Sequence, residues 1–477
     1  MRVTKKKILF VASEAAPFIA TGGLAEVVGS LSKALAKTKR YDVRVILPLY
    51  QDIKQDYRNK FEYIGNFDVN LSWRKLYCGV FRYVLDGVTY YFVDNEYYFK
   101  RHGCYGHFDD GERFAFFGKA VLDVMGYVDF IPDIMHCHDW QAALALLYLK
   151  TEYCHYERYQ FIKALFTIHN IEYQGKYSLD ILEDLFGISY NYVHYLEYRG
   201  AINLMKGAIE LSDRFSTVSP SYAQEIKYEY YAHGLDPIIR RNEHKLCGIL
   251  NGIDIDYYNP ATDKALFANY SAQDLTKKAV CKQELQKLLN LPVKSDTPIV
   301  AVISRLVAHK GLDLITAVME EALQQDLQFV VLGTGEGEYE HYFTYLANKY
   351  QDKVAAIIAF DSDLSRKIYG GADMFLMPSK SEPCGLSQMI ASRYGAVAIV
   401  RETGGLKDSI IPYGAGGNGF TFANYNAHDM LYVLKEAVNL YRNKEEWQKL
   451  ALKAATTDFS WSKSAKDYEA LYKSILS

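Results

Sequence analysis

The sequence predicts an α/β protein made of two doubly wound parallel-sheet halves, and three observations support this prediction. Short apolar runs alternate with helical patterns along nearly the whole chain, as in parallel-sheet proteins. A chain of 477 residues is too long for a single hydrophobic core. The motif Thr-Gly-Gly-Leu occurs twice, at Thr21–Leu24 and Thr403–Leu406, each time between an apolar run and the start of a helical pattern.

The apolar runs mark the expected strands, and the amphipathic segments after them mark the expected helices. In the first half, strands are expected at Lys7–Ala12, Val43–Leu47, Tyr90–Val93, Ile134–His136, Ala164–Thr167 and Arg214–Val218. In the second half, they are expected at Ile299–Ile303, Gln328–Leu332, Val354–Ile358, Met374–Met377 and Ala396–Val400. Expected helices include Glu26–Ala36, Leu275–Leu289, Gly385–Tyr394 and Trp461–Leu476.

The turn Asn251–Asp254 and the irregular stretch after it read as a linker, with a boundary near Asp254–Asp263. We therefore expect one domain at residues 1–255 and a second at residues 256–458. The segment 459–477 has apolar residues at helical spacing, so we expect a helix that crosses back and packs on the first domain.

Composition limits the classes of function. The formal net charge is −3, so no global basic field attracts nucleic acid or a membrane surface. The seven cysteines are scattered without a Cys-x-x-Cys pair, which disfavours zinc and a disulfide framework and fits a cytoplasmic location. Glu14 and Pro17 cut short the apolar run after Lys5–Lys7, which favours a first strand over a signal peptide. No apolar stretch is long enough to cross a bilayer.

Each Thr-Gly-Gly-Leu turn places two glycines at the start of a helix. Backbone N–H groups at such a position attract negative charge. Glycine also lets the backbone approach a ligand closely, because it has no Cβ atom. Two such turns suggest two nucleotide-binding halves that face one ligand, although an ordinary strand-to-helix turn has the same pattern.

Polar residues and glycines gather where the expected strands end. In open parallel sheets, ligands bind beyond the carboxyl ends of the strands. The segments at these ends are Ser13-Glu14, His136–Trp140, His169-Asn170, Ser219, Ser304-Arg305, Gly333–Glu336 and Ser379–Gly385. Their number in both halves favours a cleft between two sheets, built for a polar ligand.

Two cations and one carboxylate are notable at these ends. Arg305 ends an expected strand and Lys310 follows one short loop later, so the two could clamp a diphosphate or simply lie on the surface. Glu382 precedes Pro383, which fits the first position of a helix. The carboxylate of Glu382 could bind sugar hydroxyls, balance a developing positive charge, or cap that helix.

Two further motifs are less specific. Gly333-Thr334-Gly335 lacks the complete Gly-x-Gly-x-x-Gly spacing and is also compatible with a plain turn. His136-Cys137-His138-Asp139 suggests a metal, but no third ligand cluster has fitting spacing. A histidine that reaches a sugar hydroxyl, or a buried core histidine, fits better, and His169 has the same ambiguity.

In combination and in this order, the motifs resemble those of bacterial glycogen synthases and plant starch synthases over nearly the whole chain. The matching segments are TGGLAEVVGSL (21–31), HCHDWQAAL (136–144), FTIHNIEYQG (166–175), NLMKGAIELSD (203–213), STVSPSYAQEI (216–226), LNGIDIDYYNPATD (250–263), SRLVAHKGLDL (304–314), SEPCGLSQ (381–388), RETGGLKDSI (401–410) and FSWSKSAKDYEALY (459–472). The resemblance implies the GT-B fold, in which two Rossmann-like domains flank a deep cleft. The first domain would take the acceptor and the second the nucleotide sugar.

The resemblance also implies roles for individual residues. Arg305 and Lys310 would hold the donor diphosphate, Glu382 would contact the transferred glucose and His138 its hydroxyls, so these four are the expected catalytic residues. The expected donor-binding residues are Gly22, Gly23, Glu26, Asn251, Gly333, Thr334, Phe360, Cys384, Gly385, Leu386, Thr403, Gly404 and Gly405. Among them, Phe360 would lie under adenine. Candidates for the acceptor path are Tyr105, Trp140, Tyr173 and Gln174.

The chain departs from the family pattern at three places. Ala20 stands where the family usually has a lysine tied to donor binding, which removes a positive charge near the diphosphate. Glu26 replaces the usual aspartate, and the helix after Glu382 carries Met389 and Ile390 where some relatives have a second carboxylate. Glu382 would therefore act alone.

The implied reaction is retaining transfer of glucose from ADP-glucose to the non-reducing end of an α-1,4-glucan, with no metal or organic cofactor and no nucleic-acid or membrane partner. Without a suitable carboxylate pair, same-face attack is favoured over double displacement. The alternatives are a glucan-binding homologue weakened by Ala20, a GT-B enzyme with other substrates such as a phosphorylase or a UDP-sugar transferase, and an NAD oxidoreductase. Donor preference, processivity, chain-length preference and oligomeric state stay open.

Overall fold

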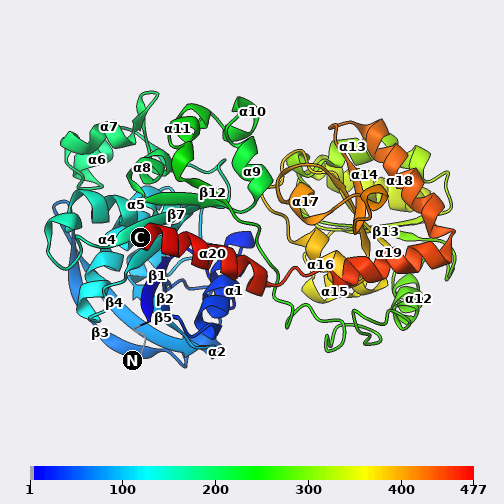
Figure 1. The fold of residues 1–477 in the computed structure, drawn as a ribbon, viewed down its shortest axis with the longest axis horizontal. Helices are drawn as coiled ribbons and strands as arrows, with labels where there is room; N and C mark the ends of the chain where they lie inside the picture. Colours follow the sequence, from blue (N-terminus) through cyan, green and yellow to red (C-terminus); the bar gives the residue numbers. More distant parts are fainter. Residues whose placement is uncertain (1–4) are drawn as a thin grey trace. The chain divides into compact units, whose positions relative to one another are not determined.

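The computed structural model describes residues 5–477, which divide into two compact units (Figure 1). The first unit ends at Asn251 and takes in Trp461–Ser477, and the second unit is Gly252–Ser460. This division falls a few residues before the expected boundary at residue 255. The reason is local: Ile253 pairs with Ser460, and its N–H donates to the Phe459 carbonyl at 2.8 Å, so this segment belongs to the second unit.

The first unit is built on a mixed sheet with β1 (Lys6–Val11) at its centre. On one side follow β2 (Tyr41–Pro48) and β5 (Val88–Asp94), and on the other follow β6 (Ile134–His138), β7 (Lys163–Ile168), β11 (Arg214–Thr217) and β12 (Leu246–Gly248), all parallel. The chain order therefore reverses between β1 and β6. Such a switch point is where open parallel sheets bind ligands.

All six strands expected in this half are present, with ends shifted by at most two residues. Strands β3 (Glu62–Leu71) and β4 (Arg74–Leu85) were not predicted; they form an antiparallel ribbon that continues the sheet beyond β5. Nor were the short strands predicted, namely β12, β8 (Lys176–Tyr177), β9 (Glu197–Tyr198) and β10 (Ala201–Asn203). Two- and three-residue strands leave no periodic signal in the sequence.

The second unit repeats this plan with a six-stranded parallel sheet. Strand β13 (Ile299–Ile303) is followed on one side by β14 (Gln328–Leu332) and β15 (Val354–Ile357), and on the other by β16 (Met374–Met377), β17 (Val397–Arg401) and β18 (Gly419–Phe422). The switch point lies between β13 and β16. Three of the five expected strands have the expected ends, and β18 was not predicted.

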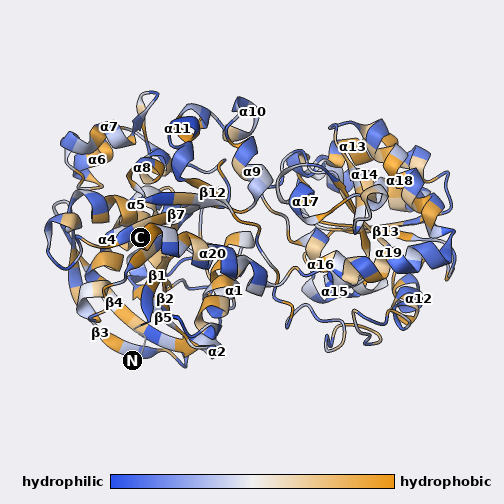
Figure 2. Ribbon diagram, viewed as in Figure 1, coloured by the Kyte–Doolittle hydropathy of each residue, from blue (hydrophilic) through white to orange (hydrophobic). Residues whose placement is uncertain are grey.

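Helices cover the faces of both sheets. In the first unit these are α1 (Gly23–Lys37), α2 (Gln55–Arg58), α3 (Glu96–Phe99), α4 (Asp110–Tyr127), α5 (Asp139–Thr151), α6 (Ile181–Asp184), α7 (Val193–Leu196), α8 (Leu204–Leu211), α9 (Pro220–Glu225), α10 (Glu229–Ala232), α11 (Asp236–Arg241) and α20 (Trp461–Leu476). In the second unit they are α12 (Lys278–Leu288), α13 (Leu312–Ala322), α14 (Gly337–Lys349), α15 (Ser362–Gly371), α16 (Ser387–Arg393), α17 (Gly404–Ser409), α18 (Ala427–Tyr441) and α19 (Lys444–Thr456). Apolar residues concentrate in the strands and on the sheet-facing sides of the helices (Figure 2).

Helix α20 packs on the first unit. Its buried face includes Tyr468, Leu471, Tyr472 and Ile475, the residues whose spacing predicted the helix. The guanidinium of Arg40, just after α1, donates to Glu469 of α20 at 2.8 Å. None of the helices in residues 5–477 is long and apolar enough to span a membrane.

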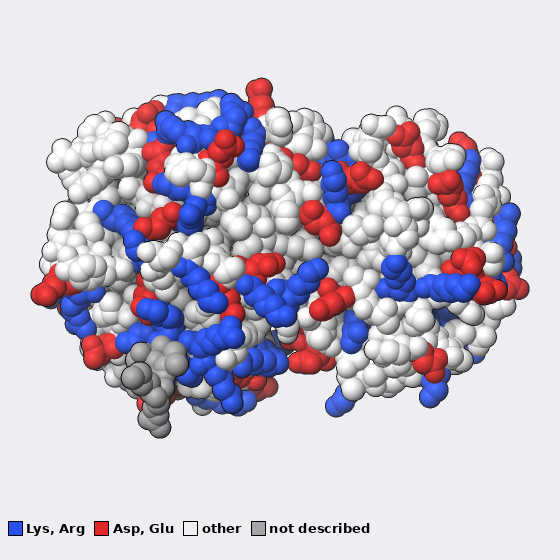
Figure 3. All heavy atoms as spheres, viewed as in Figure 1, with Lys and Arg blue, Asp and Glu red and all other residues white. Residues whose placement is uncertain are grey.

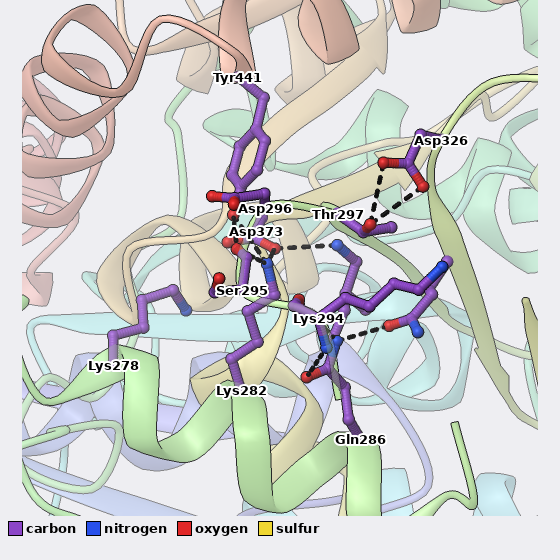
Figure 4. A network of polar contacts seen from close by, with 12 residues as sticks. Lys278, Lys282, Gln286, Lys294, Ser295, Asp296, Thr297, Asp326, Asp373 and Tyr441 are labelled. Atoms are coloured by element: carbon purple, nitrogen blue, oxygen red, sulfur yellow. Dashed lines mark hydrogen bonds and ion pairs between the residues drawn. The ribbon is translucent and has the colours of Figure 1, made fainter. Parts of the chain in front are cut away.

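A buried polar network holds the amino ends of β13 and β16 (Figure 4). Asp373, just before β16, accepts hydrogen bonds from the Ile299 N–H and from Lys282 Nζ, both at 2.9 Å. Lys282 also donates to the Tyr441 hydroxyl at 2.7 Å and to the Ser295 carbonyl at 3.0 Å. The network ties α12 and α18 to the amino ends of these strands. The switch-point residues lie at the opposite, carboxyl ends.

Candidate active site

At the switch point of the second unit, Lys310 and Glu382 form an ion pair. Lys310 follows β13 and Glu382 follows β16, and the distance from Lys310 Nζ to Glu382 Oε2 is 2.7 Å. The Ser379 hydroxyl donates to the same oxygen at 3.0 Å, and Glu382 is buried. Two donors therefore hold one oxygen of the carboxylate, and the alternative that Glu382 caps a helix is wrong.

The helix after Glu382 begins later than predicted. It starts at Ser387, so Pro383 does not occupy its first position and the expected start at Gly385 is also wrong. Gly385 adopts a left-handed φ of 71°, which interrupts the helical path. The Gln388 amide donates to the carbonyls of Cys384 at 3.1 Å and Gly385 at 2.9 Å, so residues 382–386 form a separate loop fastened to α16.

The second Thr-Gly-Gly-Leu turn packs against this loop. A Cβ atom on Gly404 would lie less than 3.0 Å from the Glu382 carbonyl oxygen, and one on Gly405 would lie equally close to the backbone of Cys384. The Gly405 N–H donates to the carbonyls of Glu382 and Pro383, both at 3.2 Å. In this structure the Gly405 N–H is therefore occupied by the protein's own carbonyls.

The first turn, in contrast, is open. Gly22 and Gly23 are exposed at the start of α1, and a Cβ atom on either would have no described protein atom within 4 Å. The hydroxyl of Thr21 donates to Glu14 Oε1 at 2.8 Å, and the Thr21 N–H also donates to this carboxylate. Helix α1 thus presents its N-terminus for an anion, while the exposed residue before the turn, Ala20, supplies no cation.

Glu14 joins this turn to Tyr105. The Tyr105 hydroxyl lies 2.7 Å from Ser13 Oγ and donates to the buried carboxylate of Glu14. Burial, and next to it the charge of Glu14, raise the pKa of Tyr105 well above its usual value, so this hydroxyl stays protonated. Glu14 was expected only as a strand-end residue, and the signal that pointed to it is its place just after the first expected strand.

Three histidines lie at the ends of β6 and β7: His136 and His138 are buried in β6, and half-buried His169 follows β7. His138 Nδ1 lies 3.0 Å from His169 Nε2, and the ring centroids of His138 and His136 are 4.1 Å apart. Burial lowers the pKa of His138 well below its usual value and that of His169 to about 3, so both are neutral at pH 7. His138 Nε2 has no hydrogen-bond partner among the described residues. His169 was not among the expected site residues, but it is paired with His138, which was.

Asp139 follows His138 in a left-handed conformation with φ of 56°. Its carboxylate accepts the His169 N–H at 2.7 Å, yet burial raises the pKa of Asp139 to about 7. In residues 5–477, no group of three or more His, Cys, Asp or Glu side chains is arranged to hold a metal ion.

The remaining donor candidates differ in exposure. Arg305 and Thr334 are exposed, Phe360 after β15 is 94% exposed, and Cys384 is buried. Asn251, the last residue before the second unit, is buried, and its Oδ1 has no partner in the described chain. Glu26 is half-buried in the first turn of α1. Leu386 is the last residue of the loop 382–386, and Thr403 directly precedes α17.

The Gly-x-Gly motif is explained by backbone packing. A Cβ atom on Gly333 would lie less than 3.0 Å from the Ser304 carbonyl oxygen, and Gly335 pairs with Leu306. The Leu306 N–H donates to the Thr334 carbonyl at 2.8 Å. These contacts fasten the loop after β14 to the one that carries Arg305.

The acceptor candidates are of two kinds. Trp140 is buried against Phe114, with ring centroids 5.3 Å apart, and the Gln174 amide donates to the carbonyls of Ile171 and His233 and accepts from Asn203. These two side chains therefore stabilise the unit. Tyr173 is more than half exposed and stays available for a ligand.

Charges of both signs are interspersed over the face shown in Figure 3, in keeping with the net charge of −3. Individual side chains and helix N-termini would therefore have to bind an anion.

Comparisons with known proteins agree along the whole chain. A family model described as starch synthase catalytic domain matches residues 7–241, and one described as glycosyl transferases group 1 matches residues 287–454. The chain is 50% identical to a glycogen synthase of Clostridium acetobutylicum, covering 98% of this chain and 100% of that protein, and 48% identical to one of Desulforamulus reducens, covering 98% and 99%.

Solved structures give the same result. The chain is similar to the catalytic domain of starch synthase IV from Arabidopsis thaliana bound to ADP and acarbose, with a TM-score of 0.91, 34% identity, and coverage of 99% of this chain and 100% of that one. Sucrose-phosphate synthase from Thermosynechococcus elongatus, 16% identical with a TM-score of 0.62 and 99% coverage of both chains, shares the fold alone.

Proposed function

This chain belongs to the family of glycogen and starch synthases, and on that premise we propose that it transfers glucose from ADP-glucose to the non-reducing end of an α-1,4-glucan with retention of configuration. The observation that carries the proposal is the Lys310–Glu382 pair at the switch point of the second unit, in a chain that matches glycogen synthases over 98% of its length. A phosphate-binding cation and a sugar-binding carboxylate are thus adjacent.

The related starch synthase was solved with ADP and acarbose. ADP supports an adenine nucleotide as the donor's leaving group, and acarbose, an oligosaccharide, supports a glucan acceptor. The exposed ring of Phe360 is available to stack on the adenine, because stacking needs only an open aromatic face. The open N-terminus of α1 at Gly22 and Gly23 offers amides to the glucose or the phosphates.

In the proposed reaction, the bond between glucose C1 and the diphosphate oxygen breaks, and a bond from C1 to the acceptor's 4-hydroxyl oxygen forms on the same face. The proton of that hydroxyl passes to the departing diphosphate. Arg305 and Lys310 stabilise the negative charge that develops on the leaving group, as oxyanion-site donors do. Glu382 holds the glucose and faces the positive charge that develops at C1. Neutral His138 binds glucose hydroxyls.

This reaction needs no metal or organic cofactor, and the partners we propose are ADP-glucose and an α-glucan. All seven cysteines are free thiols, which supports a cytoplasmic location. The full length of the match to glycogen synthases supports an active enzyme despite Ala20.

The test is incorporation of labelled glucose from ADP-glucose into glycogen, with UDP-glucose as competitor and NMR of the new linkage. We expect α-linked product and a preference for ADP-glucose. Lys310→Met is expected to lower kcat about a hundredfold to a thousandfold, the usual effect of removing one oxyanion donor. Lys349→Met is the matched control, because it removes a surface Lys–Glu pair of similar length, 2.8 Å, and should leave kcat unchanged. Absence of transfer at saturating donor, or equal kcat for the two variants, would refute the proposal.

A further inference from the structure

The C-terminal helix reaches the histidine cluster of the first unit through one side chain. The hydroxyl of Tyr472, on α20, lies 3.0 Å from His136 Nδ1. The other ring nitrogen of His136, Nε2, lies 2.6 Å from Thr167 Oγ1, which lies 2.7 Å from Ser216 Oγ. Tyr472, His136, Thr167 and Ser216 are all fully buried. Both nitrogens of this imidazole therefore have a fixed partner.

His136 in turn contacts His138. Their ring centroids are 4.1 Å apart with the planes tilted by 33°. Phe10 of β1 contacts both, at 5.3 Å from His138 and 4.9 Å from His136, so the three rings form one packed group. Interiors this dense transmit a shift of one ring to the next. The orientation of His136 therefore constrains the orientation of His138.

We propose that Tyr472 is a positioning residue for His138, acting through His136. The inference rests on the proposed function, in which His138 binds the transferred sugar. It assigns a role in the sugar site to α20, a helix that returns to the first unit only after the whole second unit. Tyr472 itself does not contact substrate in this proposal.

The physical reason lies in the hydrogen bond. Without the tyrosine hydroxyl, His136 Nδ1 would face a site that water does not reach, and a buried polar atom without a partner is costly. The ring can then rotate or exchange the proton between its nitrogens to find another partner. Either change alters the face that His136 presents to His138. His138 then also changes its geometry toward His169, 3.0 Å away.

Two neighbouring tyrosines show that the effect should be specific to Tyr472. Tyr468 lies one turn earlier on α20 and contacts the His136 ring at 5.8 Å, but the hydrogen bond to Nδ1 comes from Tyr472. Tyr41 of β2 contacts the ring of Tyr472 at 5.9 Å, and both are buried. Removing the Tyr41 hydroxyl therefore perturbs the same aromatic packing without removing a partner of His136.

The experiment compares Tyr472→Phe with Tyr41→Phe in the full chain, by steady-state kinetics with ADP-glucose and glycogen and by NMR of the imidazole nitrogens in protein labelled at its twelve histidines. For Tyr472→Phe we expect kcat to fall about fivefold, KM for ADP-glucose to stay within about twofold, and the nitrogen resonances of both His136 and His138 to shift. Tyr41→Phe should show none of these changes. Unchanged kcat together with unshifted His138 resonances in Tyr472→Phe would overturn the proposal, as would equal losses in both variants.

A second variant keeps the test valid if Tyr472→Phe folds poorly. Thr167→Val removes the partner of the other His136 nitrogen and should shift the same His138 resonances and lower kcat in the same range. Failure of the proposed function would appear differently: the wild-type protein would transfer no glucose, while the NMR comparison would still report whether Tyr472 positions His138.

Discussion

The two Thr-Gly-Gly-Leu turns should respond differently to a Gly→Ala substitution at the first residue of the helix that each begins, Gly404 of α17 and Gly23 of α1. Gly404→Ala places a methyl group less than 3.0 Å from the Glu382 carbonyl oxygen, at a residue whose φ is 43°. The left-handed conformation costs an alanine about 1 kcal/mol, and forcing the backbone apart costs about 1–3 kcal/mol more. Gly23→Ala meets no described atom within 4 Å and adds a better helix former to α1.

The expected loss for Gly404→Ala is therefore about 3 kcal/mol of unfolding free energy in the second unit. For a unit of this size, that lowers the melting temperature by about 6–12 °C. Gly23→Ala should change it by about 1 °C or less. Differential scanning calorimetry measures both, with the second-unit transition assigned on variants of its core.

Kinetics completes the comparison. Because Gly404 packs against the Glu382 backbone, Gly404→Ala should also lower kcat at temperatures where the protein is folded. In Gly23→Ala, a rise in KM for ADP-glucose without thermal destabilisation would mean that the ligand itself approaches this backbone. A melting temperature of Gly404→Ala within 2 °C of wild type would refute the reasoning, and so would equal destabilisation by both substitutions.

Three further outcomes are expected. Burial lowers the pKa of Lys278 from 10.5 to about 8, so between these pH values the unfolded chain binds more protons than the folded one. The free energy of unfolding of the second unit therefore rises with pH over this range, by up to about 3 kcal/mol. Urea unfolding at several pH values should show this rise in the wild type and not in Lys278→Met. Burial lowers the pKa of His169 to about 3 from 6.5, so the first unit should lose stability as pH falls between these values, and acid unfolding of His169→Gln should be less steep. Phe360→Ala should leave the melting temperature unchanged, because the ring is 94% exposed. It should raise KM for ADP-glucose about tenfold through lost stacking, and an unchanged KM would show that Phe360 is not part of the adenine site.

The sequence predicted the framework of the site because strand ends follow from local patterns. Apolar runs located β1, β6, β13 and β16. The polar residues at or after the ends of these strands, Glu14, His138, Arg305 and Glu382, lie at the two switch points. The physical reason is that a parallel sheet places all its carboxyl ends on one edge. No long-range information was needed for this part.

The remaining features depend on contacts between distant segments. The repeated motif gave no indication that the Gly405 N–H donates to carbonyls of residues 382–383, whereas no described atom lies close to Gly22 and Gly23. Pro383 suggested a helix start, but the left-handed Gly385 and the Gln388 side chain hold the loop apart from α16. The pairing of His138 with His169 joins residues 31 positions apart on neighbouring strands, which no local spacing encodes.

The division of the chain has a consequence for its synthesis. The first unit takes in Trp461–Ser477, so its last helix leaves the ribosome only after all of Gly252–Ser460 has been translated. At typical elongation rates of about 5–20 residues per second, the N-terminal sheet waits on the order of ten seconds or more with the surface for α20 uncovered. The unit that begins first is thus completed last. Nascent chains that stop before Trp461 would expose to chaperones and proteases the surface that Tyr468, Leu471 and Tyr472 cover.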